Sequence, residues 1–143
     1  MAREALLTID CSSYSKDIAD IIMLLNKIGW GYAGNQMEYL PLNDNDMFDW
    51  KKEALSLEKL FAVISEKQNV GELTGVILYH SDSDKGITVL ARNTKEINLS
   101  IDINRKTLER EYTDISWYIT NIVAELEENG CMIEHLGYRE QIG

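Results

Sequence analysis

The sequence predicts an α+β fold in which about three helices pack against a mostly antiparallel sheet. Apolar residues recur at helical spacing in three separate segments, which is typical of helices with one buried face. Between the second and third of these segments, three strand-like runs follow one another with short polar connections, and such connections favour antiparallel pairing. Because 143 residues is a typical size for one domain, we expect a single globular domain over residues 1–143.

The first element is expected to be a buried strand at residues 5–10, an apolar run that is long enough for a strand and too short for a helix. A helix should follow. Ser15 is placed to cap its first turn, and Gly29 can take the left-handed conformation at its end. The apolar stripe of this helix consists of Ile18, Ile21, Ile22, Leu25 and Ile28.

A hairpin is expected next. Residues 30–32 and 37–40 carry aromatic side chains at alternate positions, as strands often do, and they flank Gly34 and Asn35. These two residues tolerate positive φ, which suits a tight turn. Pro41 lacks a backbone N–H, so it should end the pairing.

Residues 42–49 are polar and acidic without an apolar period, which indicates an exposed loop. Residues 50–55 fit either a short strand or the first turn of a helix, and we favour the strand. A second helix of about three turns should begin after Ser56 as its cap and end before Gly71. Its apolar positions are Leu57, Leu60, Phe61 and Ile64.

Three strands are then expected at residues 73–80, 87–92 and 96–103, joined as an antiparallel meander. In the last of them, apolar and polar residues alternate strictly, which predicts one buried face and one solvent-exposed face.

The third helix should follow Thr113 as its cap and end before Gly130, and a final strand is expected at residues 131–138. The apolar stripe of this helix consists of Ile115, Tyr118, Ile119, Ile122, Val123 and Leu126.

The charge of the chain is strongly negative: 24 acidic residues against 14 basic ones give a net charge of -10. Nucleic-acid binding needs clustered Lys and Arg, so direct binding to DNA or RNA is not expected. A chain this acidic attracts basic proteins, although the same charge also serves solubility alone in many proteins.

The compartment is expected to be the cytoplasm. The start of the chain lacks the apolar run of a signal peptide, and no segment reaches the length of a membrane span. The chain has only two cysteines, Cys11 and Cys131, and they are far apart in the sequence. This favours reduced thiols in the core over a disulfide framework.

The two histidines, His80 and His135, are the first candidates for catalysis. His80 ends a strand beside Asp82 and Asp84, which allows a metal site or an oriented base, but a histidine at a strand end usually just faces water. Cys131 and His135 lie four apart, about 13 Å in a strand, too far for a thiolate–imidazole pair. We therefore expect no catalytic residue and no enzymatic activity.

The acidic residues of the 42–49 segment suggest a calcium loop, but the spacing fails. Phe48 would occupy the third ligand position and Asp49 the obligatory glycine. The glycines form no phosphate-binding cluster after a strand. We expect neither a metal nor a cofactor.

Three short segments carry a family resemblance: residues 29–32 (Gly-Trp-Gly-Tyr), 39–44 (Tyr-Leu-Pro-Leu-Asn-Asp) and 116–118 (Ser-Trp-Tyr). With these segments, the small acidic chain resembles bacterial toxin-immunity proteins of contact-dependent growth inhibition systems. The resemblance implies that the protein neutralises one cognate toxin domain in the cytosol. It implies no catalytic residue.

If that role holds, carboxylates would imitate nucleic-acid phosphates and fill the basic cleft of a nuclease toxin, or cover a nearby surface, with Phe48 or Trp50 as an aromatic anchor. Two other functions remain open. One is a small enzyme or ligand-binding domain with a pocket between helices and sheet that uses His80 or His135. The other is an acidic subunit of a stable assembly, which predicts a large apolar patch. The predicted partner-binding residues are Asp44, Asp46, Asp49, Trp50, Asp82 and Asp84.

Overall fold

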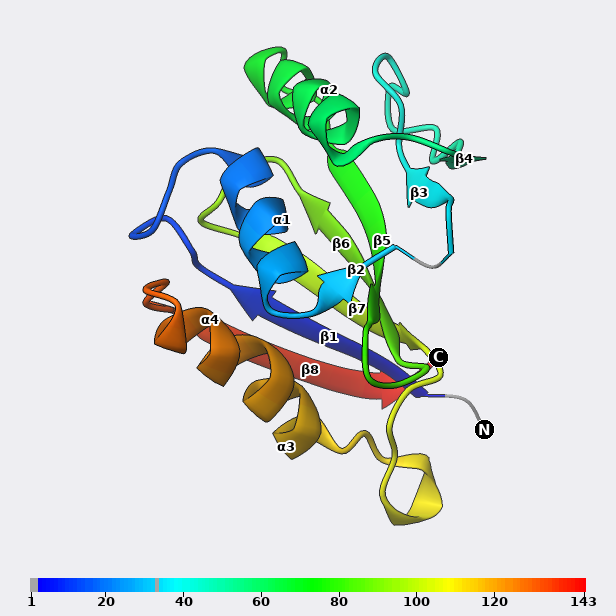
Figure 1. The fold of residues 1–143 in the computed structure, drawn as a ribbon. Coiled ribbons are helices and arrows are strands. Elements are labelled where there is room, and N and C mark those ends of the chain that lie inside the picture. Colours follow the sequence, from blue (N-terminus) through cyan, green and yellow to red (C-terminus); the bar gives the residue numbers. More distant parts are fainter. Residues whose placement is uncertain (1–2, 33) are drawn as a thin grey trace.

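The computed structural model describes residues 3–32 and 34–143 and has an α+β fold, as the sequence predicted. Eight strands form one antiparallel sheet in the order β4-β3-β5-β6-β7-β1-β8, and β2 also pairs with β5 (Figure 1). The elements are β1 (Arg3–Ile9), α1 (Ile18–Lys27), β2 (Trp30–Gly31), β3 (Met37–Tyr39), β4 (Lys51–Glu53), α2 (Leu57–Asn69), β5 (Thr74–His80), β6 (Gly86–Ala91), β7 (Ile97–Ile103), α3 (Ile115–Tyr118), α4 (Ala124–Glu128) and β8 (Leu136–Ile142).

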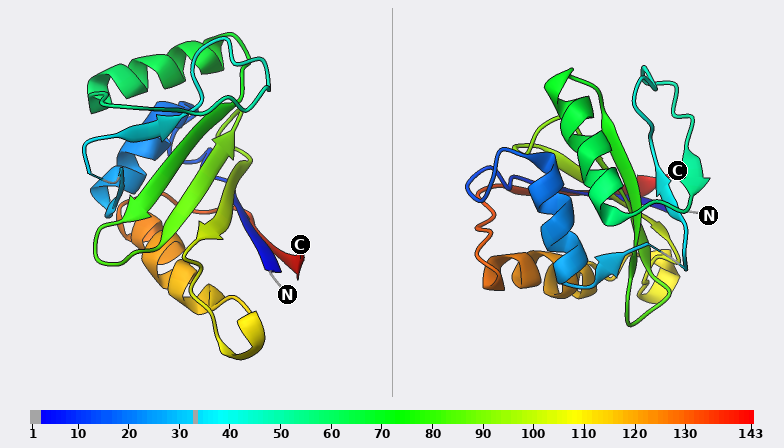
Figure 2. Two further views of the ribbon diagram at one scale, coloured as in Figure 1. Left: turned by 90° about the vertical axis from the view of Figure 1, so that its right-hand side faces the viewer. Right: turned by 45° about the horizontal axis from the view of Figure 1, so that its top comes forward.

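The helices lie on one side of the sheet. Helix α1 and the helix formed by α3 and α4 cover the same face, and α2 lies beside α1 at the end where β5 begins (Figures 1 and 2). Along β7, Ile97, Leu99 and Ile101 are buried under these helices and alternate with less buried polar residues. The predicted alternation of β7 is confirmed, and no described helix covers the opposite face.

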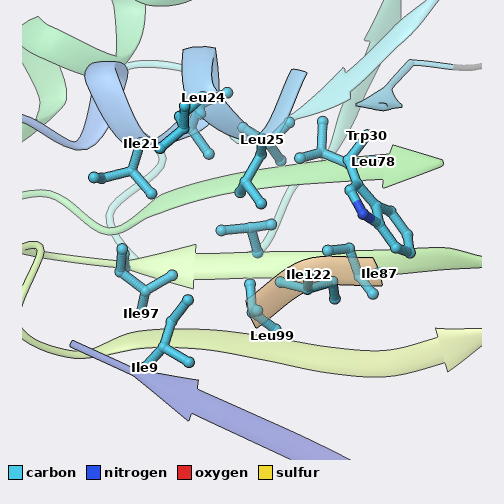
Figure 3. Close-up of a cluster of buried hydrophobic side chains, with 14 of the residues drawn as sticks. Ile9, Ile21, Leu24, Leu25, Trp30, Leu78, Ile87, Ile97, Leu99 and Ile122 are labelled. Atoms are coloured by element: carbon cyan, nitrogen blue, oxygen red, sulfur yellow. The ribbon is translucent and has the colours of Figure 1, made fainter. Parts of the chain in front are cut away.

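The core lies between this face and the apolar stripe of α1. Side chains of α1 point down onto side chains of four strands, and Ile122 of the C-terminal helix lies next to Leu99 and Ile87 (Figure 3). Burial of these branched residues supplies the main driving force of folding, at about 25 cal/mol per Å² of apolar surface. The residues labelled there are Ile9, Ile21, Leu24, Leu25, Trp30, Leu78, Ile87, Ile97, Leu99 and Ile122.

The predicted hairpin of residues 30–32 and 37–40 is wrong. Strands β2 and β3 do not pair with each other, because both pair with the same edge of β5. Trp30 lies opposite His80 at the end of β5, and Tyr39 lies opposite Val76 near its middle. The seven residues of β5 are long enough to pair with both short strands one after the other. The strand favoured at residues 50–55 is confirmed as β4, which pairs with β3.

Two of the three predicted helix caps are wrong. Ser56 caps α2 as expected, since its Oγ accepts the Lys59 N–H at 3.2 Å. At the start of α1, however, the Ile18 N–H donates to the side chain of Gln68 in α2, at 2.8 Å, rather than to Ser15. Thr113 instead accepts a hydrogen bond from Arg105 at 2.8 Å. At α1 a distant side chain takes the place of the local cap, whereas α3 begins after Asp114 without a side-chain cap.

The last strand begins later than predicted, because residues 131–135 form a connection and β8 spans Leu136–Ile142. The backbone N–H of Cys131 donates to the Leu126 carbonyl at 2.9 Å, which holds the start of this connection against the end of α4. Pairing with β1 then sets the register, with Leu136 opposite Ile9. The helix before it contains a wide π-helical turn, Ile119–Val123, between α3 and α4.

Candidate protein-binding site

The residues predicted to bind a partner lie in two separate places. Asp44, Asp46 and Asp49 belong to residues 41–50, here called the 41–50 loop, which joins β3 to β4 near the start of β5. Asp82 and Asp84 lie in the turn after the other end of β5. Seven residues of strand span about 20 Å, so the structure does not bring the two acidic groups together.

Asp44 is buried, with 7% of its surface exposed. Its carboxylate accepts the backbone N–H groups of Phe48, at 3.0 Å, and Asp49, at 2.9 Å. The side chain therefore holds the loop together, and a partner cannot reach it. The contact role that the sequence predicted for Asp44 can be carried only by its exposed neighbours.

Those neighbours include two carboxylates and two apolar side chains. Asp46 forms an exposed ion pair with Arg92 at 2.8 Å, and Asp49 is exposed. Met47 and Phe48 lie between them, with 77% and 49% of their surfaces exposed. The loop thus presents an apolar tip flanked by acidic groups.

Trp50 does not belong to this tip, because it is partly buried against the sheet. A Cβ atom on Gly75 would lie 2.6 Å from Leu40 and 2.9 Å from Trp50, so these side chains pack directly over that glycine. Of the two aromatic anchors predicted from the sequence, Phe48 is the one that the structure presents to solvent.

The backbone of the loop is strained. Asn43, Asn45, Asp46 and Phe48 all have positive φ, with values of 67, 53, 59 and 56°. This conformation costs roughly 1–2 kcal/mol for a residue with a bulky side chain, and Asn and Asp tolerate it better than Phe. Strain of this kind persists only where surrounding contacts impose it, and it is concentrated at functional sites.

The contacts that impose it begin at a buried ion pair beneath the loop. Lys67 has only 1% of its surface exposed, and its ammonium donates to the Pro41 carbonyl at 2.7 Å and to Glu72 at 3.3 Å. Glu72 also accepts the Asn43 N–H at 2.8 Å. Sequence reasoning missed Lys67, because it lies in the polar last turns of α2, where a lysine normally faces solvent.

The second acidic group follows His80, whose ring packs against two tryptophans. The His80 ring lies 5.0 Å from Trp30 and 5.1 Å from Trp117, between centroids, and its Nδ1 lies 3.1 Å from the Ser83 hydroxyl. Its hydrogen-bond partner is thus a hydroxyl and not Asp82 or Asp84. Beside it lies a shallow surface hollow of about 500 Å³, lined by Gly31, Tyr32, Tyr79, His80, Ser81, Ser83, Asp84 and Asn104.

The two cysteines are buried and carry free thiols. Burial raises the pKa of the Cys11 thiol, and the neighbouring Cys131 thiol raises it further. They behave as small core residues. Within residues 3–32 and 34–143, no group of three or more His, Cys, Asp or Glu side chains could hold a metal ion. In the same part of the chain, no helix combines the length and apolarity that crossing a membrane requires.

Comparisons with known proteins assign no function to the chain. No family model matches the chain, and neither a curated protein nor a solved structure shows significant similarity to it.

Proposed function

We propose that this protein is an immunity protein that binds and neutralises a basic toxin domain, and that the 41–50 loop makes the central contact. The observation that carries the proposal is Phe48, a half-exposed aromatic residue held at positive φ between two exposed carboxylates. An exposed Phe in a strained conformation contributes little to this fold. A partner that covers its ring would account for both features.

The loop has the features of a binding hot spot. Aromatic anchors at the centre of an interface supply most of its binding free energy once surrounding groups exclude water. Because Asp44 and Lys67 hold the backbone in place, Phe48 is ordered before the partner arrives, and less conformational entropy is lost on binding.

The acidic groups attract a cationic partner and guide it towards the loop. A net charge of -10 attracts a cationic surface, and this attraction raises the association rate more than the final affinity. Asp46 and Asp49 flank the anchor, where they can meet Lys or Arg residues that a nuclease uses to hold phosphates. Covering those residues excludes the nucleic acid, so inhibition is by occlusion.

The test is co-expression with the small basic proteins encoded next to this chain, followed by affinity purification at low and high salt. The native chain is expected to form a 1:1 complex that weakens as salt rises, because salt screens the steering charges. Phe48→Asn should weaken the complex by about 30-fold, the equivalent of a 2 kcal/mol hot spot.

Tyr14→Asn is the matched control, because it removes an exposed aromatic side chain outside the loop. Asparagine also tolerates positive φ, so Phe48→Asn should keep or raise the free energy of unfolding while it weakens binding. Equal affinities for the Phe48→Asn and Tyr14→Asn variants would exclude the loop as the anchor. Absence of a complex with every basic neighbour would exclude the proposed function itself.

A further inference from the structure

The two edges of the sheet differ in how they are protected. The β4 edge has three residues, including the exposed Lys51 and Lys52, and short charged edges resist pairing with other chains. The β8 edge has seven residues with no proline, no lysine and no bulge in its pairing with β1. Its charged residues are Arg139 and Glu140, so it lacks most of the features that prevent an edge strand from pairing.

The unpaired backbone groups of β8 follow from its pairing with β1. The Asp10 N–H donates to the His135 carbonyl at 3.0 Å. Because hydrogen-bonded pairs alternate in an antiparallel ladder, the backbone groups of Gly137, Arg139 and Gln141 point towards β1. Those of the alternate residues point outward, and no hydrogen bond within residues 3–32 and 34–143 uses them. They are Leu136, Tyr138, Glu140 and Ile142.

Three of the four outward residues of this edge carry large apolar or aromatic side chains, and the strand is close to neutral. Leu136, Tyr138 and Ile142 are exposed large hydrophobic residues. The carboxylate of Glu140 is paired with Arg3 at 2.5 Å, so the remaining charge on the strand is that of Arg139. A cationic partner would gain nothing from this edge, so the acidic character of the chain does not explain it.

We propose that β8 pairs antiparallel with β8 of a second copy of this chain, about a two-fold axis at Arg139. The four outward residues lie symmetrically on either side of Arg139, so this register places each outward group opposite an outward group of the other copy. Leu136 faces Ile142, and Tyr138 faces Glu140. The edge is thus complementary to itself, and pairing covers its exposed apolar side chains.

The charges predict how salt acts on this dimer. Each copy carries a net charge of -10, and the two Arg139 side chains meet at the axis. The two net charges repel each other, and so do the two Arg139 side chains. Because salt screens both repulsions, the dimer strengthens as salt rises. Binding of a basic partner to the 41–50 loop has the opposite salt dependence. The dimer does not require binding of a basic partner.

Light scattering after gel filtration tests the dimer directly. The mass should rise from 16.4 kDa towards twice that value as protein concentration increases, and the rise should begin at lower concentration in high salt. Tyr138→Pro removes one outward N–H and leaves the groups that face β1, so a folded variant should stay monomeric. A monomeric native chain at every concentration and salt would overturn the proposal.

Disulfide trapping tests the register, whatever happens to the proline variant. Residue 139 faces its own copy in a pair that is not hydrogen-bonded, with Cα atoms about 4.5 Å apart, which a disulfide can span. Residue 141 faces residue 137, so the two copies of residue 141 lie about 13 Å apart. Cys11 and Cys131 are buried and should not compete.

Arg139→Cys and Gln141→Cys are compared under oxidised glutathione. Each glutathione disulfide takes two electrons and two protons from a pair of thiols, which become one disulfide between copies. Arg139→Cys should form the linked dimer at least ten times faster than Gln141→Cys. Equal rates would show random collision and overturn the two-fold register.

Discussion

Glu140 keeps its negative charge in a largely buried position. Burial by itself would raise the pKa of this carboxyl, but hydrogen bonds from Tyr138, Arg3 and Thr113 outweigh burial and lower the pKa from 4.5 to about 2. Because the pKa is lower in the folded state, the ionised carboxylate stabilises the fold above pH 4.5. This contribution should be lost as the pH falls towards 2.

Glu140→Gln should remove much of that acid sensitivity. We expect the free energy of unfolding of the native chain to lose about 2 to 3 kcal/mol more than that of the variant between pH 5 and pH 2. Urea unfolding of dilute protein at several pH values measures the free energy of unfolding of the native chain and of the variant. Parallel pH profiles for the two chains would contradict the proposed hydrogen bonds of Glu140.

Single residues also show the limit of sequence reasoning. The acidity of the 42–49 segment was visible, but whether each carboxylate faces solvent or the loop backbone was not. Asp44 and Asp49 have the same side chain five positions apart, yet one is buried and accepts two N–H groups while the other is exposed. The difference arises from left-handed backbone at Asn43 and Phe48, which no local pattern indicates.

At the scale of elements, the 41–50 loop depends on α2 through Lys67. Lys67→Met keeps the length of the side chain but leaves the Pro41 carbonyl and one oxygen of Glu72 without their buried donor. Removing one member of a buried ion pair costs about 3 to 5 kcal/mol. We expect that loss in chemical unfolding, together with faster amide exchange in the 41–50 loop.

The exposed Lys59→Met of the same helix is the control, and it should change the free energy of unfolding by less than about 0.5 kcal/mol. If Lys67→Met lowered the free energy of unfolding by as little as Lys59→Met, the buried ion pair would not hold the loop.

Elements with a long apolar period were predictable, and short ones were not. The apolar stripes of α1 and α2 and the alternation of β7 each have enough positions to predict the type of the element and which of its faces is buried. Strands β2 and β3 have two and three residues, so pairing with each other or with β5 cannot be decided from local sequence. The start of β8 depends on pairing with β1, more than 120 positions away in the chain.

At the scale of the whole molecule, the two proposed surfaces belong to opposite edges of one sheet. The 41–50 loop joins β3 to β4, and four strands, β5, β6, β7 and β1, separate β3 from β8. Neighbouring strands lie about 4.8 Å apart, so the surfaces are more than 20 Å from each other. Occupying one should not obstruct the other.

This separation predicts independent behaviour. Phe48→Asn should leave self-association unchanged, and Tyr138→Pro should leave the affinity for the basic partner unchanged, because energetic effects add when sites share no contact. At high protein concentration and moderate salt, two copies of this chain and two copies of the basic partner should assemble into one complex. Sedimentation of the mixture measures the stoichiometry, and mutual exclusion of the partner and the second copy would contradict the arrangement.

The π-helical turn gives the C-terminal helix one residue more than a regular α-helix would need over the same length. Within this turn, the carbonyl of Asn121 accepts the indole N–H of the buried Trp30 at 3.0 Å. Deleting Thr120 would convert the turn to an ordinary helical one, and Leu126 would keep its place in the core because the wide turn alone holds the extra residue. A one-residue gap at this turn should therefore be tolerated, whereas a gap elsewhere in the helix would turn every later side chain by about 100°.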